Sequence, residues 1–434
     1  MQTLRREVGL PGAVMMGLGS IVGTGVFVSI GIAAGIAGPA LLIGIVVGAL
    51  VAGANGMSSA QLAANHPVSG GTYEYGYRFL SPVLGFTAGW MFLVAKSASA
   101  ATAALGFSGY LLEAVGVAPG GLLVPVALAA VLVLTVVVLT GIRRSSITNI
   151  VIVSVTLLTL LAFVLTSVPA AVAERGATLT PFFANADGPI GIREVLFASA
   201  LLFVAYTGYG RIATLGEEVT NPRRTIPRAI VTTLVVTMIL YVLVAAAGVG
   251  SVGAGVLSEA AQTQAAPLEV AARRVGVPGM PVVVTIGAVT AMLGVLLNLL
   301  LGLSRVLLAM GRRKDMPSLF ARLDRAGITP TAAVIAVAVL IGGLALIGDV
   351  RTTWSFSAFT VLIYYAITNL AALFIPQEGR IFPRWISVAG LAGCLSLAAF
   401  VELRVLTVGV GVIVLGVLWH LLAARILRGS VRPR

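Results

Sequence analysis

The sequence has few of the side chains that build catalytic, metal-binding or disulfide-bonded sites. Charged residues make up only 10% of its 434 residues, and it contains one cysteine and two histidines. The single cysteine, Cys394, excludes an intrachain disulfide and a cysteine metal cluster, and we interpret the isolated His66 and His420 as structural or interfacial. No apolar segment carries a cluster of His, Asp, Glu or Cys, and no phosphate-binding loop or nucleotide fold is visible. The sequence therefore predicts neither an enzyme nor a protein with a metal or cofactor, and no direct use of ATP.

Apolar residues, in contrast, make up 59% of the chain and give it a mean hydropathy of +1.06. Soluble domains do not reach this balance. Twelve apolar segments are each long enough to span a hydrocarbon core of ~30 Å: approximately 8–37, 40–64, 82–112, 122–141, 147–168, 194–218, 228–250, 280–309, 331–348, 353–375, 384–401 and 404–425. Because no long linker divides them and the first segment lacks a cleavage site typical of signal peptides, the sequence predicts an all-α, multi-pass membrane protein with a single transmembrane domain over residues 1–434.

The positive charge is concentrated in alternate loops. The net charge of +13 comes mainly from arginines at the N-terminus, in the loops after the second, fourth, sixth, eighth and tenth segments, and in the C-terminal tail. Cytoplasmic loops of membrane proteins carry an excess of Lys and Arg, so the pattern predicts a protein of the cell membrane with both termini in the cytoplasm. The same pattern accounts for the basic balance without a nucleic-acid partner, and the basic tail is suited to contact anionic lipid.

Two of the apolar segments are interrupted by glycine. The first contains the stretch 19–25 (GSIVGTG), and the sixth contains the stretch 203–210 (FVAYTGYG). Each glycine weakens a helix by about 1 kcal/mol relative to alanine, and backbone freed at this depth must face protein or a wet cavity. Glycine-rich stretches also suit close packing between helices, which is the structural alternative. The two stretches are five segments apart, and a repeat with an odd number of spans has its second copy inverted in the membrane. Two glycine-interrupted segments at matching positions of such repeats indicate the binding site of a transporter.

Four stretches resemble motifs of the amino acid–polyamine–organocation permeases, in the branch related to cationic amino acid transporters. They are 19–27 (GSIVGTGVF), 67–73 (PVSGGTY), 217–228 (EEVTNPRRTIPR), and 302–306 (GLSRV) followed by Met316-Pro317, and they occur in the order typical of the family. The resemblance implies the leucine-transporter fold, with a first five-helix repeat (8–168), an inverted second repeat (194–375) and two further helices (384–425). It also implies that the substrate binds between the interrupted first and sixth helices.

The helix ends at these two breaks suit the two charges of an α-amino acid. The start of a half-helix offers free N–H groups and about half a positive charge, and the end of a half-helix offers free carbonyls. The N–H groups from Gly23 to Gly25, with the hydroxyl of Ser20, would hold a carboxylate, and the carbonyls at the helix ends would accept from an ammonium group. Phe203 or Tyr206 would close over the substrate as a gate, with ordinary packing as the alternative for both. The predicted substrate site is Ser20, Ile21, Gly23, Thr24, Gly25, Phe203, Val204, Ala205, Tyr206 and Thr207.

One lysine lies near the middle of the third apolar segment. Lys96 is too deep for its amine to reach the membrane surface easily, and a helical arrangement puts the small residues Ser99 and Ala103 on its face. An ionisable residue at this depth is a functional candidate by default, and burial disfavours its charged form. We consider three roles: a proton carrier that couples transport to the proton gradient, a fixed cation in place of sodium, or a contact for an anionic substrate group. A structural lysine bonded to backbone carbonyls at a helix break is the alternative.

The chain departs from the family pattern at two positions. Some members carry a lysine in the fifth helix, at a place that the spacing from Asn149 matches to Thr156. Members with cationic substrates carry a glutamate in the third helix, at a place that the spacing matches to Ala95, beside Lys96. The absence of this glutamate argues against a cationic substrate. We therefore expect a neutral amino acid, with an acidic one as the alternative.

These features favour secondary active transport of an amino acid by alternating access, coupled to the proton gradient. Exchange of one amino acid for another and coupling to sodium are the alternatives, followed by a membrane-embedded enzyme and a non-transporting subunit. The expected partners are the small-molecule substrate, a coupling proton and the lipid bilayer. The sequence does not indicate an oligomeric state.

Overall fold

The computed structural model describes residues 8–66, 70–140, 146–185, 188–213, 219–324, 327 and 329–426, and its secondary structure is almost entirely helical. Residues 67–69 and 217–218, which begin two of the family-like motifs, lie outside the described residues. The longest helices are α3 (Leu41–Asn65), α5 (Pro82–Ala114), α6 (Leu123–Leu139), α7 (Ser146–Ala173), α10 (Pro222–Val252), α13 (Met280–Arg312), α15 (Val350–Leu373) and α17 (Leu403–Ile426).

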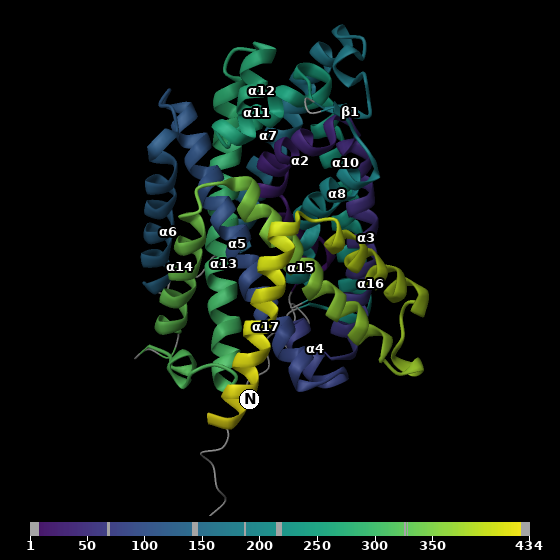
Figure 1. The fold of residues 1–434 in the computed structure, drawn as a ribbon, viewed down its shortest axis with the longest axis vertical. Coiled ribbons are helices and arrows are strands. Elements are labelled where there is room, and N and C mark those ends of the chain that lie inside the picture. The colour runs from purple at the N-terminus through teal and green to yellow at the C-terminus, as the bar shows by residue number, and fades with distance from the viewer. Residues whose placement is uncertain are drawn as a thin grey trace, which may run out of the picture.

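Shorter helices complete the fold. Five of them are mainly apolar: α1 (Leu10–Ile21), α2 (Ile30–Ala37), α8 (Ile192–Tyr206), α14 (Thr331–Ala345) and α16 (Arg384–Ala399). Four others are α4 (Thr72–Phe79), α9 (Gly210–Ala213), α11 (Ala254–Thr263) and α12 (Pro267–Val275). Strands β1 (Ala184–Asn185) and β2 (Gly188–Pro189) form a small antiparallel pair. Helices α11, α12 and strand β1 lie at one end of the molecule and α4 at the other, which agrees with the predicted alternation of loops (Figure 1).

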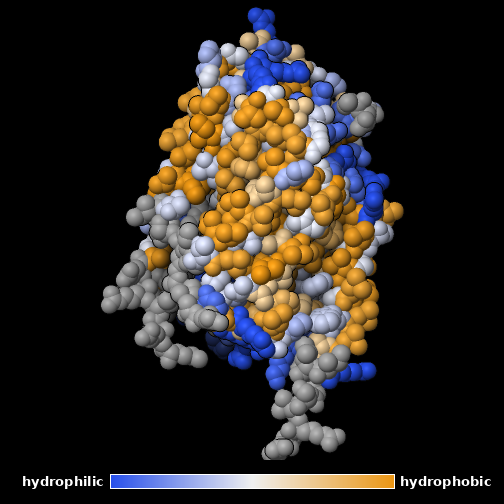
Figure 2. Space-filling view, turned by 90° about the vertical axis from the view of Figure 1, so that its left-hand side faces the viewer, coloured by the Kyte–Doolittle hydropathy of each residue, from blue (hydrophilic) through white to orange (hydrophobic). Residues whose placement is uncertain are grey.

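The outer surface of the helices is apolar. In the described part of the chain, nine helical segments are long and apolar enough to cross a membrane, and α1, α14 and α16 are shorter apolar helices. Large side chains such as Leu132, Leu158 and Leu415 are exposed, and Figure 2 shows a broad hydrophobic band between hydrophilic ends. Contiguous apolar surface of this extent belongs against lipid. The structure is therefore that of a multi-pass membrane protein.

Helix α5 runs through the middle of the molecule, where α15, α13, α6, α14 and α17 all pack against it (Figure 1). Small residues let α15 approach closely, and hydroxyl pairs join the two helices. The Oγ atoms of Ser99 and Ser357 are 2.7 Å apart, and Thr102 donates to Thr353 Oγ1 at 2.9 Å. Side-chain hydrogen bonds of this kind hold membrane helices together. They fix the part of α5 that carries Lys96.

Two features of the fold differ from the sequence-based expectation. The segment 251–279, predicted as a loop, contains α11 and α12, which are too short and too polar to stand out by hydropathy. Helices α7 and α13 continue beyond their apolar segments, to Ala173 and Arg312. Apolar composition marks only the part of a helix that lies in the hydrocarbon core. The length of a helix that continues past the membrane is therefore underestimated from hydropathy.

Helix α12 carries a buried carboxylate. The side chain of Glu269 is 1% exposed, and its Oε1 accepts from Arg273 at 2.7 Å, while Glu113 binds the same guanidinium at 2.8 Å. Glu269 Oε2 has no hydrogen-bond partner among the described residues. Burial raises the pKa of Glu269, the neighbouring Glu113 adds to this effect, and Arg273 opposes it.

We expect Glu269→Gln to stabilise the protein at neutral pH. Because the folded pKa lies above the unfolded value, folding disfavours the charged carboxylate, and this cost disappears as the pH falls through the folded pKa and below the unfolded value of about 4.3. Glutamine carries no charge and escapes this cost, so the variant should unfold at a higher temperature near pH 7.5 and at the wild-type temperature near pH 4. Thermal unfolding in detergent measures both. Glu259→Gln, at an exposed position on α11, is the control, and a less stable Glu269→Gln at neutral pH would show that the ion pair outweighs burial.

Candidate functional site

The first helix break separates α1 from a short π-helix, η1 (Gly25–Ser29), which continues into α2. Val22 still donates to the carbonyl of Leu18, at 2.8 Å, and the N–H groups of Val26 and Phe27 then bond back to the carbonyl of Gly23. Among the described residues, no backbone carbonyl accepts from Thr24 or Gly25. As predicted from the glycines, the second half-helix therefore begins with free N–H groups at this depth.

The second break follows α8, which ends at Tyr206. A 3₁₀ turn, η5 (Thr207–Tyr209), leads into α9. The hydroxyl of Thr207 donates to the carbonyl of Val204 at 2.7 Å and so caps the end of α8. This end presents the last carbonyls of α8, as the sequence predicted for an interrupted sixth segment.

The two breaks pack directly against each other through glycine. A Cβ atom on Gly25 would lie 2.5 Å from the Cβ of Ala205, and one on Gly208 would overlap the carbonyl of Ser20 and lie 2.6 Å from the nitrogen of Ile21. Only residues without a side chain allow backbone to approach backbone this closely. Glycine therefore both interrupts the helices and brings the interruptions together.

Two buried tyrosines bind the carbonyls at the breaks. The hydroxyl of Tyr241, on α10, lies 3.0 Å from the carbonyl oxygen of Ile21 and 3.2 Å from that of Ala205. The hydroxyl of Tyr365, on α15, donates to the carbonyl of Thr207 at 3.0 Å. These are carbonyls that the sequence predicted as acceptors for a substrate ammonium. A carbonyl oxygen has two lone pairs and can accept two hydrogen bonds.

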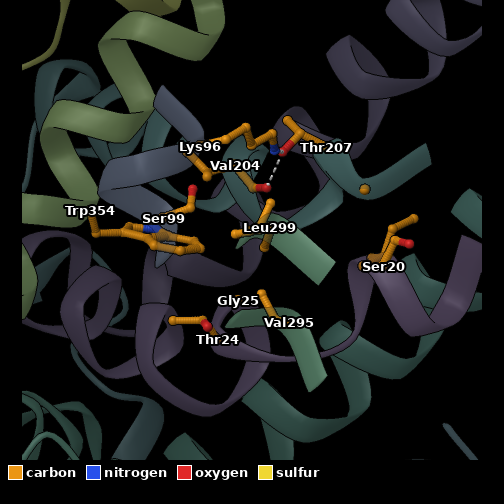
Figure 3. Close-up of a pocket in the computed structure, with 13 residues that line it drawn as sticks. Ser20, Thr24, Gly25, Lys96, Ser99, Val204, Thr207, Val295, Leu299 and Trp354 are labelled. Carbon is orange, nitrogen blue, oxygen red and sulfur yellow. Dashed lines mark hydrogen bonds between the residues drawn. The ribbon is translucent and has the colours of Figure 1, made fainter. Parts of the chain in front are cut away.

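A cavity lies where the breaks face α5, α13 and α15 (Figure 3). The volume of this cavity that the centre of a water molecule can occupy is about 50 Å³. Both breaks and all three helices contribute to its wall. The lining residues are Ser20, Ile21, Thr24, Gly25, Lys96, Ser99, Val204, Ala205, Thr207, Gly208, Val295, Leu299 and Trp354.

Lys96 extends from α5 to the second break. Its Nζ donates to Thr207 Oγ1 at 2.7 Å (Figure 3), and the hydroxyl of Thr207 in turn donates to Val204. The lysine is buried, and no ion pair between described residues includes it. No Asp or Glu lines the cavity. The amine is thus the only ionisable side chain among the residues that line this cavity.

Most of the predicted substrate residues meet at this cavity, but three do not line it. Gly23 is outside the lining, and a Cβ atom added to it would lie 2.6 Å from Val295 Cγ2. The ring of Phe203 packs edge-on against Tyr365 at 5.8 Å, and the hydroxyl of Tyr206 donates to the carbonyl of Ile45 at 3.3 Å. Both aromatics are fully buried in the protein core and do not cover the cavity in this structure.

The hydroxyls of the predicted site differ in their partners. Ser20 lines the cavity but donates to Met16 in its own helix at 2.9 Å. Thr24 Oγ1 is buried, and no described residue bonds to it. On α7, Thr156 donates to Ile152 at 2.8 Å and is not part of the wall. Thr24 is therefore the hydroxyl best suited to bind a ligand.

Sequence reasoning missed four side chains of the wall. Val295 and Leu299 are apolar residues of an apolar helix, so no local signal marks them. Trp354 lies near the start of its segment, where a tryptophan is typical of the membrane interface. Ser99 was predicted to share the face of Lys96 without a role in the site.

Comparison with known proteins gives a consistent result. A family model described as amino acid permease matches residues 12–425. The chain is 42% identical to an uncharacterized transporter of Mycobacterium tuberculosis, over 95% of this chain and 90% of that protein. It is 28% identical to a branched-chain amino acid permease of Bacillus subtilis, over 97% and 92% of the two chains. It is 26% identical to a vacuolar cationic amino acid transporter of Arabidopsis thaliana, over 87% and 64%.

Proposed function

This chain belongs to the amino acid permease family and is a transporter rather than an enzyme, and from this premise we propose that it moves a neutral amino acid by alternating access, coupled to the proton gradient. One observation carries the proposal: two interrupted helices meet at a cavity that offers free N–H groups, carbonyls and one buried amine. A substrate with a carboxylate beside an ammonium group complements these two helix ends.

We also propose twelve membrane crossings in the leucine-transporter arrangement. The 41-residue apolar segment Gly25–Asn65 supports two crossings, the first completed by α1, and α14 and α16 supply the crossings that their length alone leaves out. The direct contact between the breaks of the first and sixth segments supports an inverted pair of five-helix repeats. In this topology both termini face the cytoplasm from the cell membrane.

The main chain of the substrate would bind at the breaks. Its carboxylate would accept from the N–H groups of Thr24 and Gly25 and from the Thr24 hydroxyl, which has no protein partner among the described residues. Its ammonium group would donate to the second lone pairs of the carbonyls that Tyr241 and Tyr365 already bind. The helix dipoles favour both of these contacts, because the carboxylate meets the N-terminus of one half-helix and the ammonium group meets the C-terminal ends of others.

The charge of the cavity supports a neutral substrate. A cationic side chain would add a second positive charge beside Lys96, and like charges at ~4 Å repel by roughly 4 kcal/mol at an effective dielectric constant of 20. No carboxylate in the lining offsets this repulsion. The printed names of the relatives include both branched-chain and cationic amino acids. The lining of this cavity contains no carboxylate, which argues against the cationic class.

Uptake into proteoliposomes tests the proposal. We expect purified protein to take up a labelled neutral amino acid, and an inward proton gradient to drive accumulation above the external concentration. Labelled arginine should not be taken up. The absence of uptake and of counterflow for every amino acid would overturn the proposed function, whereas uptake that ignores the pH gradient would overturn proton coupling alone.

A further inference from the structure

We propose that Glu269 is a proton-binding site that controls the hairpin formed by α11 and α12. A bound proton holds the hairpin against the half-helix that follows the first break, and loss of the proton favours its release. The two helices lie together at one end of the molecule (Figure 1). Glu269 does not line the substrate cavity, so this inference goes beyond the proposed transport function.

The hairpin packs directly against α2 and is bonded to α5. A Cβ atom on Gly31 of α2 would lie 2.7 Å from the carbonyl oxygen of Leu257 on α11. The hydroxyl of Tyr110, on α5, donates to the carbonyl of Phe27 in η1 at 2.7 Å and accepts from the N–H of Leu268 at 3.2 Å. Leu268 directly precedes the buried carboxylate in α12. Release of the hairpin would therefore expose this carboxylate to water.

The carboxylate lacks one partner while the hairpin is packed in this way. Oε1 of Glu269 accepts from Arg273, but the buried Oε2 has no hydrogen-bond partner among the described residues. The guanidinium of Arg273 is shared with Glu113 at the end of α5, at 2.8 Å. When all three groups are ionised, two carboxylates meet one guanidinium, and a single proton neutralises the cluster. Because Oε2 is enclosed by protein atoms, a proton suits it better than a larger ligand.

The sign of the pH effect follows from the surroundings of Glu269. Among the described residues, the titratable groups that interact with it are Arg273 on α12 and Glu113 and Tyr110 on α5. Burial raises the pKa of Glu269, Arg273 opposes this shift, and Glu113 adds to it. Hydration of the released hairpin would return the pKa towards about 4.3. The packed hairpin therefore binds the proton more tightly, and it loses this stabilisation as the pH rises through the raised pKa.

Thiol labelling of the purified protein in detergent tests this inference. Ser258→Cys places a thiol on α11 against Gly35 of α2, and Gln262→Cys places one at an exposed position one turn further on. The native Cys394 is fully buried, so the wild type gives the background. We divide the maleimide labelling rate at the first position by that at the second, which removes the effect of pH on thiol reactivity. This ratio should rise at least ~3-fold between about pH 5 and pH 8, since one unit of pKa shift corresponds to a ~10-fold change in an equilibrium.

Four further substitutions assign the effect to the carboxylate. In Glu269→Gln the labelling ratio should stay low at every pH, because glutamine is neutral throughout. Glu113→Gln removes the neighbouring carboxylate and should move the transition to lower pH, whereas Arg273→Gln removes the guanidinium and should move it to higher pH. Glu259→Gln, at an exposed position on α11, is the matched control and should leave the transition unchanged.

The outcomes separate this inference from the proposed function. A ratio that does not change with pH in the wild type, or that rises equally in Glu269→Gln, would overturn the proton switch. Labelling does not require transport, so this test stands even if no amino acid is taken up. If the wild type accumulates substrate along a pH gradient, Glu269→Gln should do so as well, because the cavity and Lys96 are unchanged. Loss of accumulation in this variant alone would place Glu269 in the coupling mechanism and overturn a role confined to the hairpin.

Discussion

Replacing Gly208 with alanine is expected to lower amino acid uptake at least ~10-fold and to destabilise the protein by about 1–3 kcal/mol, the usual effect of overpacking a core. The added methyl group would overlap the carbonyl of Ser20 and lie 2.6 Å from the nitrogen of Ile21. Both are backbone atoms, so no side chain can turn aside to make room. The two breaks would have to separate, and the N–H groups and carbonyls that face the cavity would move apart with them.

Uptake in proteoliposomes and thermal unfolding in detergent measure the two effects. Gly343→Ala is the control, because this helical glycine has no atom within 4 Å of an added methyl group. Gly25→Ala tests the same contact from the other break, where the methyl group would meet the Cβ of Ala205 at 2.5 Å and its Cα at 2.8 Å. If Gly208→Ala transports and unfolds like the wild type, the two breaks do not pack as the structure has them.

The breaks could be predicted from the sequence because their cause is local. Glycine weakens a helix wherever it occurs, and two glycine-rich stretches five segments apart suggested that the helices would be interrupted near Gly23 and Gly208. The free N–H groups of the first break follow from helix geometry alone. The depth of Lys96 in its segment could also be counted from the sequence, and the structure puts its amine at the cavity.

The remaining wall could not be predicted because its cause is tertiary. Which face of α13 and α15 meets the breaks depends on how these helices are rotated and spaced, so nothing local marks Val295, Leu299 or Trp354. The aromatics Phe203 and Tyr206 illustrate the same limit. They precede the break, where a gate over the cavity and ordinary packing were the two alternatives, and in this structure both side chains are fully buried and do not line the cavity.

Replacing Lys96 with methionine is expected to abolish stimulation of uptake by a pH gradient while leaving amino acid exchange measurable. The amine is the titratable group of the cavity wall, and its bond of 2.7 Å to Thr207 links its protonation to the second break. An inward gradient of one pH unit corresponds to about 1.36 kcal/mol per proton, enough for ~10-fold accumulation of a cotransported solute. In Lys96→Met this accumulation should disappear, because methionine keeps most of the volume and carries no proton.

Lys96→Arg separates a proton carrier from a fixed positive charge. Arginine keeps the charge but does not release its proton in proteins, so a carrier role predicts loss of gradient-driven accumulation in this variant as well, and a fixed-cation role predicts that accumulation survives. Lys314→Met removes the other lysine, which is exposed in the loop after α13, and should leave coupling intact. Accumulation that persists in both Lys96 variants would remove this residue from the coupling mechanism while leaving transport itself in place. The Thr207 hydroxyl would then serve to shape the second break through Val204, and the coupling ion would have to bind to groups other than the one amine in the cavity.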